Sequence, residues 1–542
     1  MDLLYFDCNA TLGQRPQKHR RVRWSTEHIL EDMDLAEIAG ALVVHGVARS
    51  FDPVYGNARL KPELAKAPDR LFGVWCLAPL GDPGFYETGE DLLQAMEASD
   101  IHAARLVPGG FSLHPDVIGE TFEALQEDRI LTLLEMSWGA PDYFAFFHTL
   151  LSRYPRLPVL LTDAVWPHQR HVHRLMALHD NLHLEFSSYQ INRGIEQYVQ
   201  DFGDERLLFG AGMTEKSPGA ARAYVDYAQI SDESKQKIAG GNLKRLLKGQ
   251  GPAQPARHHR EDRIVAAARA GRPQTVFVVD AHAHVLHEGG DTAGVNYIML
   301  RGDAEGMLEV NRWCGIGRVA MMSWNGPVCT DAQNGNDIVH RAAQRFGDRI
   351  IPVATVDPTH MSPEEMDREI QLRYLRQGFV GMKPYVRMNL SYEDPAFMPW
   401  WEFGNAHRLY ALMHVASHTG GVPGIGRLAA KFPEVSWIIP HSGGSYPFAE
   451  EVAACIKDHP NVYAEITLTP VTNRIVEFLV EATDDEHVLF GTDAPMRDPR
   501  QQLGWVLWAD LPEQTRVQIL GANFQRILDR VRIGKQETAL RR

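Results

Sequence analysis

The sequence lacks any apolar run long enough to cross a membrane. A helix that spans a bilayer needs about 20 consecutive apolar residues, and no run in this chain of 542 residues approaches that length. The opening residues 1–7 also lack the basic start and long apolar centre of a signal peptide. We therefore expect a cytoplasmic protein with no membrane partner.

Cysteine is scarce, and positive charge is not in excess. Five cysteines are scattered without a C-x-x-C pair, which predicts reduced thiols. The 55 lysines and arginines against 69 aspartates and glutamates give a formal net charge of −14. This balance argues against nucleic acid or an anionic membrane as the main partner. It leaves a small molecule as the expected ligand.

The most informative stretch is the apolar run that begins at Val276 and leads into a His-x-His pair. Val276 to Val279 are β-branched or aromatic residues, a pattern typical of a strand buried on both faces of a parallel sheet. His282 and His284 follow, and side chains two apart on a strand share a face. The pair can therefore bind a metal ion, although two polar residues leaving a strand for solvent would look the same.

Three later apolar runs also end in one polar residue each. Residues 409–413 lead into His414, residues 435–440 into His441, and residues 488–492 into Asp493. In a (β/α)8 barrel, the functional residues gather at the carboxyl ends of the strands. The sequence therefore predicts an α/β fold with a TIM-barrel-like domain whose polar site collects these side chains.

This constellation resembles the amidohydrolase superfamily, in particular the branch that contains aminocarboxymuconate-semialdehyde decarboxylase and related hydrolases. The matching segments are residues 280–284, 378–383, 406–414, 432–444, 461–463, 489–493 and 521–528. The resemblance implies one divalent metal ion, most commonly zinc, and it implies the ligands His282, His284, His414 and Asp493. His441 matches a residue that binds a second metal or acts as acid or base in that family.

The resemblance also implies the type of reaction. We expect a metal-dependent hydrolase that attacks a small amide, lactone or ester with a metal-activated water, with Asp493 and His441 as catalytic residues. A metal-dependent, non-oxidative decarboxylase of the same family would use the same ligands and remains an alternative. A non-catalytic binding or scaffold protein is a third hypothesis.

Cations in the second half predict an anionic substrate. Lys383 and Arg387 end the fourth expected strand and would face the barrel mouth, so a carboxylate is the expected substrate group. Lys383 has a second role in some relatives, as a carbamylated bridge between two metals. His418 competes with His414 for the metal, or contacts the substrate.

Residues 1–248 repeat the pattern of the second half without its histidines. Asn9 and Thr11 stand where His282 and His284 stand, and Glu135, Asp163 and Gly212 end the runs that match His414, His441 and Asp493. These residues are poor zinc ligands as a set. We expect a metal-free, pseudo-catalytic barrel here, or a different active site that uses Arg105, Glu135 and Asp163.

The sequence therefore predicts two tandem (β/α)8 barrels. The expected boundaries are a degenerate barrel at 1–248, a linker rich in Gly, Pro and Gln at 249–274, a metal-binding catalytic barrel at 275–532 and a tail at 533–542. Relatives often form homodimers. The chain is therefore expected to form a homo-oligomer, or to pair its own barrels as an intrachain pseudo-dimer.

Overall fold

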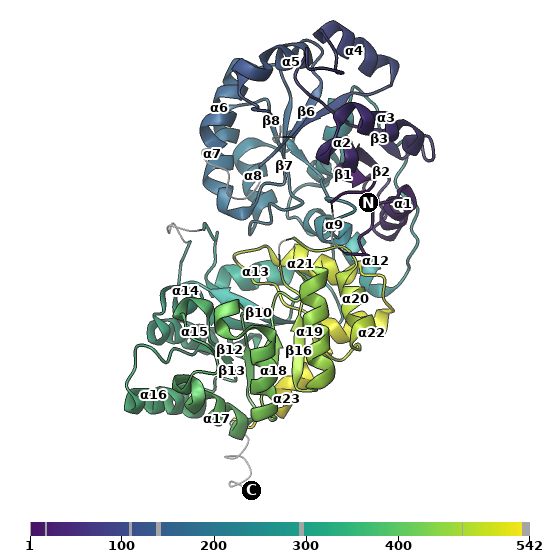
Figure 1. Cartoon of the computed structure of the whole chain (residues 1–542). Coiled ribbons are helices and arrows are strands. Elements are labelled where there is room, and N and C mark those ends of the chain that lie inside the picture. The colour runs from purple at the N-terminus through teal and green to yellow at the C-terminus, as the bar shows by residue number, and fades with distance from the viewer. Residues whose placement is uncertain are drawn as a thin grey trace. The chain divides into compact units, whose positions relative to one another are not determined.

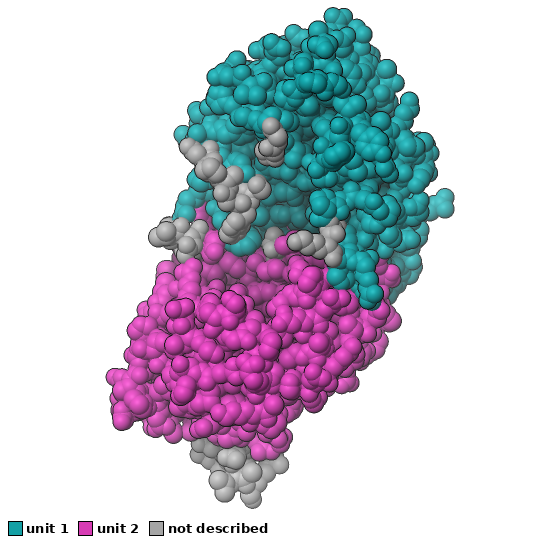
Figure 2. All heavy atoms as spheres, in the orientation of Figure 1, with its two compact units in different colours: residues 1–271 teal, residues 272–542 magenta. Residues whose placement is uncertain are grey.

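The chain divides into two compact units, which are described separately. The computed structural model describes residues 2–16, 19–107, 111–136, 143–291, 297–468 and 470–533. Its units are Met1–Gly271 and Arg272–Arg542 (Figure 2). Within the described residues, no helix combines the length and the apolar character needed to cross a membrane.

The second unit is built on a parallel eight-stranded sheet whose strands follow chain order. The strands are β10 (Val279–Val285), β11 (Arg318–Ser323), β12 (Ile350–Thr355), β13 (Gly381–Lys383), β14 (Tyr410–Leu412), β15 (Ser436–Ile439), β16 (Val462–Glu465) and β17 (Val488–Leu489). Ala494, beyond β17, bridges to Ala283 in β10, and the backbone N–H of His284 donates to the Ala494 carbonyl at 2.6 Å. These contacts join the first strand to the last, so the sheet closes into a barrel.

Helices surround this barrel (Figure 1). They are α13 (Ala304–Cys314), α14 (Asn325–Cys329), α15 (Ala332–Phe346), α16 (Pro363–Ile370), α17 (Met398–His407), α18 (Gly421–Lys431), α19 (Tyr446–Asp458), α20 (Ile475–Ala482), α21 (Pro499–Leu507), α22 (Glu513–Val517) and α23 (Asn523–Arg530). The limits of α13 show how the sequence sets such bounds. The Asp303 side chain accepts from the Gly306 N–H and begins the helix, and Gly315, at φ 87°, ends it.

The strand that carries the His-x-His pair starts later than its apolar run suggests. The run begins at Val276, but β10 begins at Val279, and Phe277 is about half exposed. The pairing of β10 with β11 shifts register between Asp280 and Ala283. Strand β10 then continues through His284, so both histidines are held by strand backbone rather than by a loop.

The first unit contains two parallel sheets with strand orders β1-β2-β3 and β4 to β9. The strands are β1 (Phe6–Leu12), β2 (Gly40–His45), β3 (Leu71–Gly73), β4 (Trp75–Cys76), β5 (Ala103–Leu106), β6 (Leu131–Glu135), β7 (Val159–Thr162), β8 (Leu182–Glu185) and β9 (Leu207–Leu208). Only Val74 separates β3 from β4, so these two occupy one strand position. The Cys8 N–H donates to the Phe209 carbonyl at 2.9 Å and joins β1 to the end of β9. The unit is therefore a second TIM-barrel-like domain.

The helices of the first unit include one from the expected linker. They are α1 (Thr26–Leu35), α2 (Gly46–Ser50), α3 (Pro53–Leu64), α4 (Gly89–Ala98), α5 (Pro115–Glu127), α6 (Tyr143–Arg153), α7 (Gln169–Leu178), α8 (Gly194–Phe202), α9 (Pro218–Asp226), α10 (Asp232–Gln236), α11 (Asn242–Leu246) and α12 (Arg263–Arg269). Helix α12 lies between residues 249 and 274, and its Arg269 pairs with the buried Glu37. This helix therefore packs as part of the first barrel.

The two barrels share details of their hydrogen bonding. Asp7 accepts from the Asn9 N–H at 2.9 Å, and Asp280 accepts from the His282 N–H at the same distance. Near the end of each barrel, a buried asparagine, Asn242 or Asn523, donates from Nδ2 to two backbone carbonyls, at 2.7 to 2.9 Å. Each asparagine follows a π-helical turn, Lys237–Gly241 or Gln518–Ala522.

These asparagines yield a stability prediction. Asn242→Ala and Asn523→Ala each leave two carbonyls without their side-chain donor, so each should lower the free energy of unfolding by about 2–4 kcal/mol. Urea denaturation of the full chain, followed by circular dichroism, measures the loss. The exposed Asp529→Ala on α23 should stay within about 0.5 kcal/mol of wild type. If the asparagine variants and wild type have equal urea midpoints, the asparagines do not stabilise the barrels as assigned.

Candidate metal centre and active site

A cavity of about 430 Å³ opens at the carboxyl ends of the second barrel's strands. The residues expected to be metal ligands or catalytic all line it: His282, His284, His414, His441 and Asp493. The structure therefore brings together side chains that lie as much as 211 residues apart in sequence, on or just after strands β10, β14, β15 and β17.

His282, His284 and Asp493 form the tightest group in the cavity. Oδ1 of Asp493 lies 3.1 Å from Nε2 of His284 and 3.5 Å from Nε2 of His282. All three side chains are buried, and their candidate ligand atoms lie within 4.8 Å of one another. Two imidazoles and one carboxylate are a donor set that suits zinc and similar divalent ions.

Hydrogen bonds on the far side of each ring direct the histidines toward this point. Nδ1 of His282 lies 3.0 Å from the buried Glu465 carboxylate, and Nδ1 of His284 lies 3.3 Å from the Ser323 carbonyl. A carboxylate and a carbonyl are acceptors, so both Nδ1 atoms carry the proton and both Nε2 atoms keep a free lone pair.

The Nε2 atom of His282 is the clearest sign that the residues fit a metal ion. It is buried and has no hydrogen-bond partner among the described residues. Burial lowers the pKa of His282 well below its usual value, so the ring is neutral at pH 7. A neutral imidazole with an unshared lone pair beside an ionised carboxylate is the arrangement that metal binding requires.

His414 and His441 form a pair at the edge of this group. Nε2 of His441 lies 3.2 Å from Nδ1 of His414, and Nδ1 of His441 lies 2.9 Å from the Thr467 carbonyl. The carbonyl keeps the proton on Nδ1 of His441, so His414 donates from Nδ1 and retains a lone pair on Nε2. Burial is the largest factor that lowers the pKa values, to about 2 for His414 and about 4 for His441.

His414 is less closely placed than the other expected ligands. The groups of three close donor atoms in the described residues are His282 with His284 and Asp493, and His282 with His441 and Glu465. His414 belongs to neither group. Its role as a ligand stays a prediction, and its Nε2 lone pair is compatible with that role.

Arg497 and Glu465 are the site residues that sequence reasoning missed. Arg497 lines the cavity and forms a buried ion pair with Oδ2 of Asp493, four residues earlier. Burial alone would raise the pKa of Asp493, but Arg497 and the histidines hold it well below its usual range. The i, i+4 spacing was a usable signal for Arg497. Glu465 also ends an apolar run, at the end of β16, and this was the signal that could have found it.

Of the three expected substrate-binding residues, Lys383 alone lines the cavity. Lys383 is 1% exposed, and its Nζ lies 6.0 Å from the centre of the Tyr385 ring and has no hydrogen-bond partner among the described residues. Burial lowers its pKa to about 8. Arg387 and His418 are exposed; Arg387 donates to the Val328 carbonyl at 3.3 Å and His418 to the Val386 carbonyl at 2.9 Å. Arg387 lies in a 3₁₀ turn over Val386–Met388 that follows β13.

The rest of the cavity wall is largely apolar and aromatic. Trp324 packs edge-on against His284 with ring centroids 5.0 Å apart, and Tyr385 packs similarly against His414 at 5.2 Å. Phe448, Leu468 and Met496 complete this wall. These side chains limit water around the polar group and leave room for a small molecule.

In the first barrel, the matching positions hold ion pairs instead of a donor cluster. In the described part of that unit, no group of three His, Cys, Asp or Glu side chains has the spacing of a metal site. Glu135 and Asp163 both pair with Arg105. Of the histidines that follow β7, His173 pairs with Asp201 at 2.8 Å on an exposed surface.

Several solved structures are similar to this chain. A 5-carboxyvanillate decarboxylase from Sphingomonas paucimobilis is 15% identical, covering 47% of this chain and 99% of its own, with a TM-score of 0.37. A dihydroxybenzoic acid decarboxylase from Polaromonas sp. JS666, with bound manganese and the inhibitor 2-nitroresorcinol, is 16% identical, covering 47% and 97%, with a TM-score of 0.38. A 4-oxalomesaconate hydratase from Rhodopseudomonas palustris is 16% identical, covering 49% and 98%, with a TM-score of 0.37.

No curated protein matches the chain. The family model described as amidohydrolase matches residues 279–530, from the first residue of β10 to the end of α23. Those residues contain the closed barrel, its cavity and every donor atom described above. The second unit of this protein thus matches the amidohydrolase family, over a stretch that is just under half of the whole chain.

Proposed function

We propose that the second barrel is a metal-dependent hydrolase of a small amide, lactone or ester that carries a carboxylate. The observation that carries this proposal is the content of one cavity. It holds a group of neutral imidazoles around an ionised Asp493, together with the buried, unpartnered ammonium group of Lys383. The first feature supports metal-assisted chemistry, and the second supports an anionic substrate.

His282, His284 and Asp493 would hold the metal, with His414 as the fourth expected ligand. The nitrogen and oxygen donors favour one zinc ion, although manganese accepts the same donor types. When bound, such an ion polarises a substrate carbonyl and lowers the pKa of water to roughly 7. Glu465 contributes by keeping the proton of His282 on Nδ1.

Asp493 and His441 are the proposed groups for proton transfer. Asp493 is held ionised by Arg497, which binds Oδ2 and leaves Oδ1 facing the histidines. Oδ1 can therefore accept the proton of an attacking water. Protonated Asp493 can return that proton to the leaving group, and Nε2 of His441, a lone pair at the cavity edge, is a second base that can take up a proton.

Lys383 is proposed to bind the substrate carboxylate. A buried ammonium group without a partner is costly, and an anionic ligand would remove that cost by forming a charge-assisted hydrogen bond. Arg497 adds a second cation to the same wall. The surrounding Trp324, Tyr385 and Phe448 favour a substrate with an apolar or planar body.

The same cavity supports non-oxidative decarboxylation as a second candidate function. The specific observation is that Lys383 and the metal-ligand group share one cavity, which would hold a carboxylate beside the metal. In that reaction, the carbon–carbon bond to the carboxylate breaks, CO₂ leaves, and a proton is delivered to carbon. Hydrolysis would instead add water across an acyl bond.

The metal content of the purified chain tests the centre. Wild type should contain about one divalent ion per chain, and His282→Ala/His284→Ala should lose it, because two donors cannot hold zinc tightly. Elemental mass spectrometry measures both the amount and the identity of the metal. Asn9→Ala/Thr11→Ala is the matched control at the same positions of the first barrel. A wild type without metal after repletion would refute the proposed mechanism.

Product analysis separates the two reactions. Small carboxylates labelled with ¹³C at the carboxyl group, and lactones and amides in H₂¹⁸O, form the screening set. We expect ¹⁸O to enter a new carboxylate without release of ¹³CO₂. Labelled CO₂ without uptake of ¹⁸O would identify the decarboxylase instead.

Steady-state kinetics test the role of Lys383. With a substrate found in that screen, Lys383→Met should raise KM about tenfold to a hundredfold, because a charge-assisted hydrogen bond contributes about 1.5–3 kcal/mol. Arg387→Gln, which changes an exposed cation outside the cavity, should leave KM within about twofold of wild type. If the two variants behave alike, Lys383 does not bind the substrate.

A further inference from the structure

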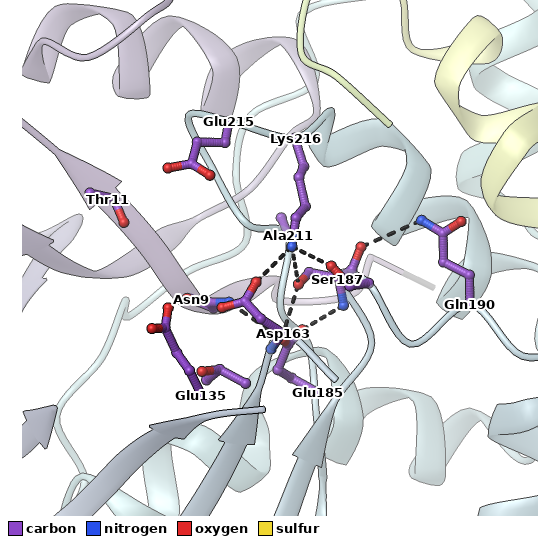
Figure 3. A network of polar contacts seen from close by, with 12 residues as sticks. Asn9, Thr11, Glu135, Asp163, Glu185, Ser187, Gln190, Ala211, Glu215 and Lys216 are labelled. Atoms are coloured by element: carbon purple, nitrogen blue, oxygen red, sulfur yellow. Dashed lines mark hydrogen bonds and ion pairs between the residues drawn. The ribbon is translucent and has the colours of Figure 1, made fainter. Parts of the chain in front are cut away.

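The first barrel contains a buried lysine beside the position that matches the metal ligand Asp493 of the second barrel. Lys216 follows β9 and is four residues beyond Gly212, as Arg497 is four residues beyond Asp493. Its Nζ donates to Oδ1 of Asp163 at 2.7 Å, and it also donates to two serine hydroxyls, Ser187 at 3.1 Å and Ser188 at 2.5 Å (Figure 3). The ammonium group thus has three oxygen partners from two segments.

The segments after β7 and β9 match segments of the second barrel's polar site. Asp163 follows β7 as His441 follows β15, and both have left-handed backbone, at φ 57° and 63°. Gly212 and Asp493, after the last strand of each barrel, share the same feature, at φ 67° and 54°. Matching backbone therefore carries different side chains in the two barrels.

The stem of Lys216 fills the space beside Gly212. A Cβ atom added to Gly212 would lie 2.7 Å from Cδ of Lys216 and 3.2 Å from its Cγ. An aspartate like Asp493 therefore cannot stand at position 212 unless the lysine moves. The metal ligand and the buried lysine are alternatives for one space.

A second buried cation extends the network. Arg105 has no exposed surface, and it donates to Asn9 at 3.0 Å, to Glu135 at 2.6 Å and to Asp163 at 3.4 Å. The Asn9 amide in turn donates to Glu185 at 3.3 Å. Asn9 stands where His282 stands, and Glu185 where Glu465 stands, so the network spans the positions of the metal centre.

The network contains as many cations as carboxylates once Arg49, which pairs with Glu135, is included. Asp163 lies between Lys216 and Arg105, and these cations overcome the effect of burial and hold its pKa well below its usual range. Burial alone would lower the pKa of Lys216, but Asp163 and Glu185 raise it. Lys216 is therefore a fixed cation at pH 7 that removes the need for an external one.

We propose that the ammonium group of Lys216 takes, in the first barrel, the structural place of the metal ion in the second. The carboxyl ends of β7, β8 and β9 are held together by this built-in cation, and the mouth of the first barrel takes up no divalent ion. The comparison with a metal rests on the proposed function of the second barrel. The role of Lys216 in the first barrel does not depend on it.

Hydrogen exchange of the full chain, followed by mass spectrometry of its peptides, tests this proposal. EDTA treatment of wild type should speed exchange in the peptide that contains β10 and leave the peptides of β7 and β8 unchanged. Lys216→Met, which keeps the stem but removes the charge, should speed exchange in β7 and β8 at least tenfold and leave β10 unchanged. Lys66→Met, at an exposed ion pair, is the matched control and should change neither region.

The double variant Asp163→Asn/Lys216→Met distinguishes ion pairing from simple damage to packing. It removes both charges, so it should recover most of the protection that Lys216→Met loses. Recovery of solubility by the double variant, if the single variant is insoluble, supports the proposal equally. Faster exchange of β7 and β8 on EDTA treatment would overturn it, as would an unaltered Lys216→Met or a double variant as damaged as the single one. If EDTA does not change the exchange rate of the β10 peptide, this result would count against the metal centre of the second barrel, but not against the role of Lys216.

Discussion

The carboxylate of Asp280 joins the first strand of the second barrel to the segment after its last strand. It accepts hydrogen bonds from the backbone of His282 at 2.9 Å, from the backbone of Thr492 at 3.0 Å and from the Thr492 hydroxyl. One donor residue, His282, is itself a candidate metal ligand, and the other, Thr492, directly precedes Asp493. The hydrogen bonds that close the barrel therefore also position the polar centre. The site is preorganised by the same contacts that complete the fold.

The sequence predicts this centre well because its residues follow strand ends. His282, His284 and Asp493 each close an apolar run, and parallel strands of a barrel bring such ends to one rim. Arg387 and His418 also follow strand ends, yet the structure places them outside the cavity. Each lies in a short 3₁₀ turn, Val386–Met388 or Ser417–Thr419, which no apolar pattern encodes. Glu465 was missed because its partner His282 is far away in sequence, and Arg497 because its role depends on the direction of its side chain.

The two barrels show that fold and site depend on different residues. Both keep buried apolar strands, a shift of register in the first strand and a buried asparagine near the end. They differ at the polar residues of the strand ends, where the second barrel has histidines and the first has Asn9, Thr11 and Asp163. Branched apolar side chains hold such a barrel together, so the polar rim is free to change its chemistry.

The left-handed backbone at Asp493 and Gly212 bears on how easily one barrel could acquire the chemistry of the other. Most side chains are disfavoured there, aspartate and asparagine are tolerated, and glycine is at no disadvantage. Asp493 therefore carries a conformational cost that Gly212 does not. An aspartate at position 212 would add that cost and would also require the stem of Lys216 to move. Building a ligand like Asp493 into the first barrel is thus not a single-residue change.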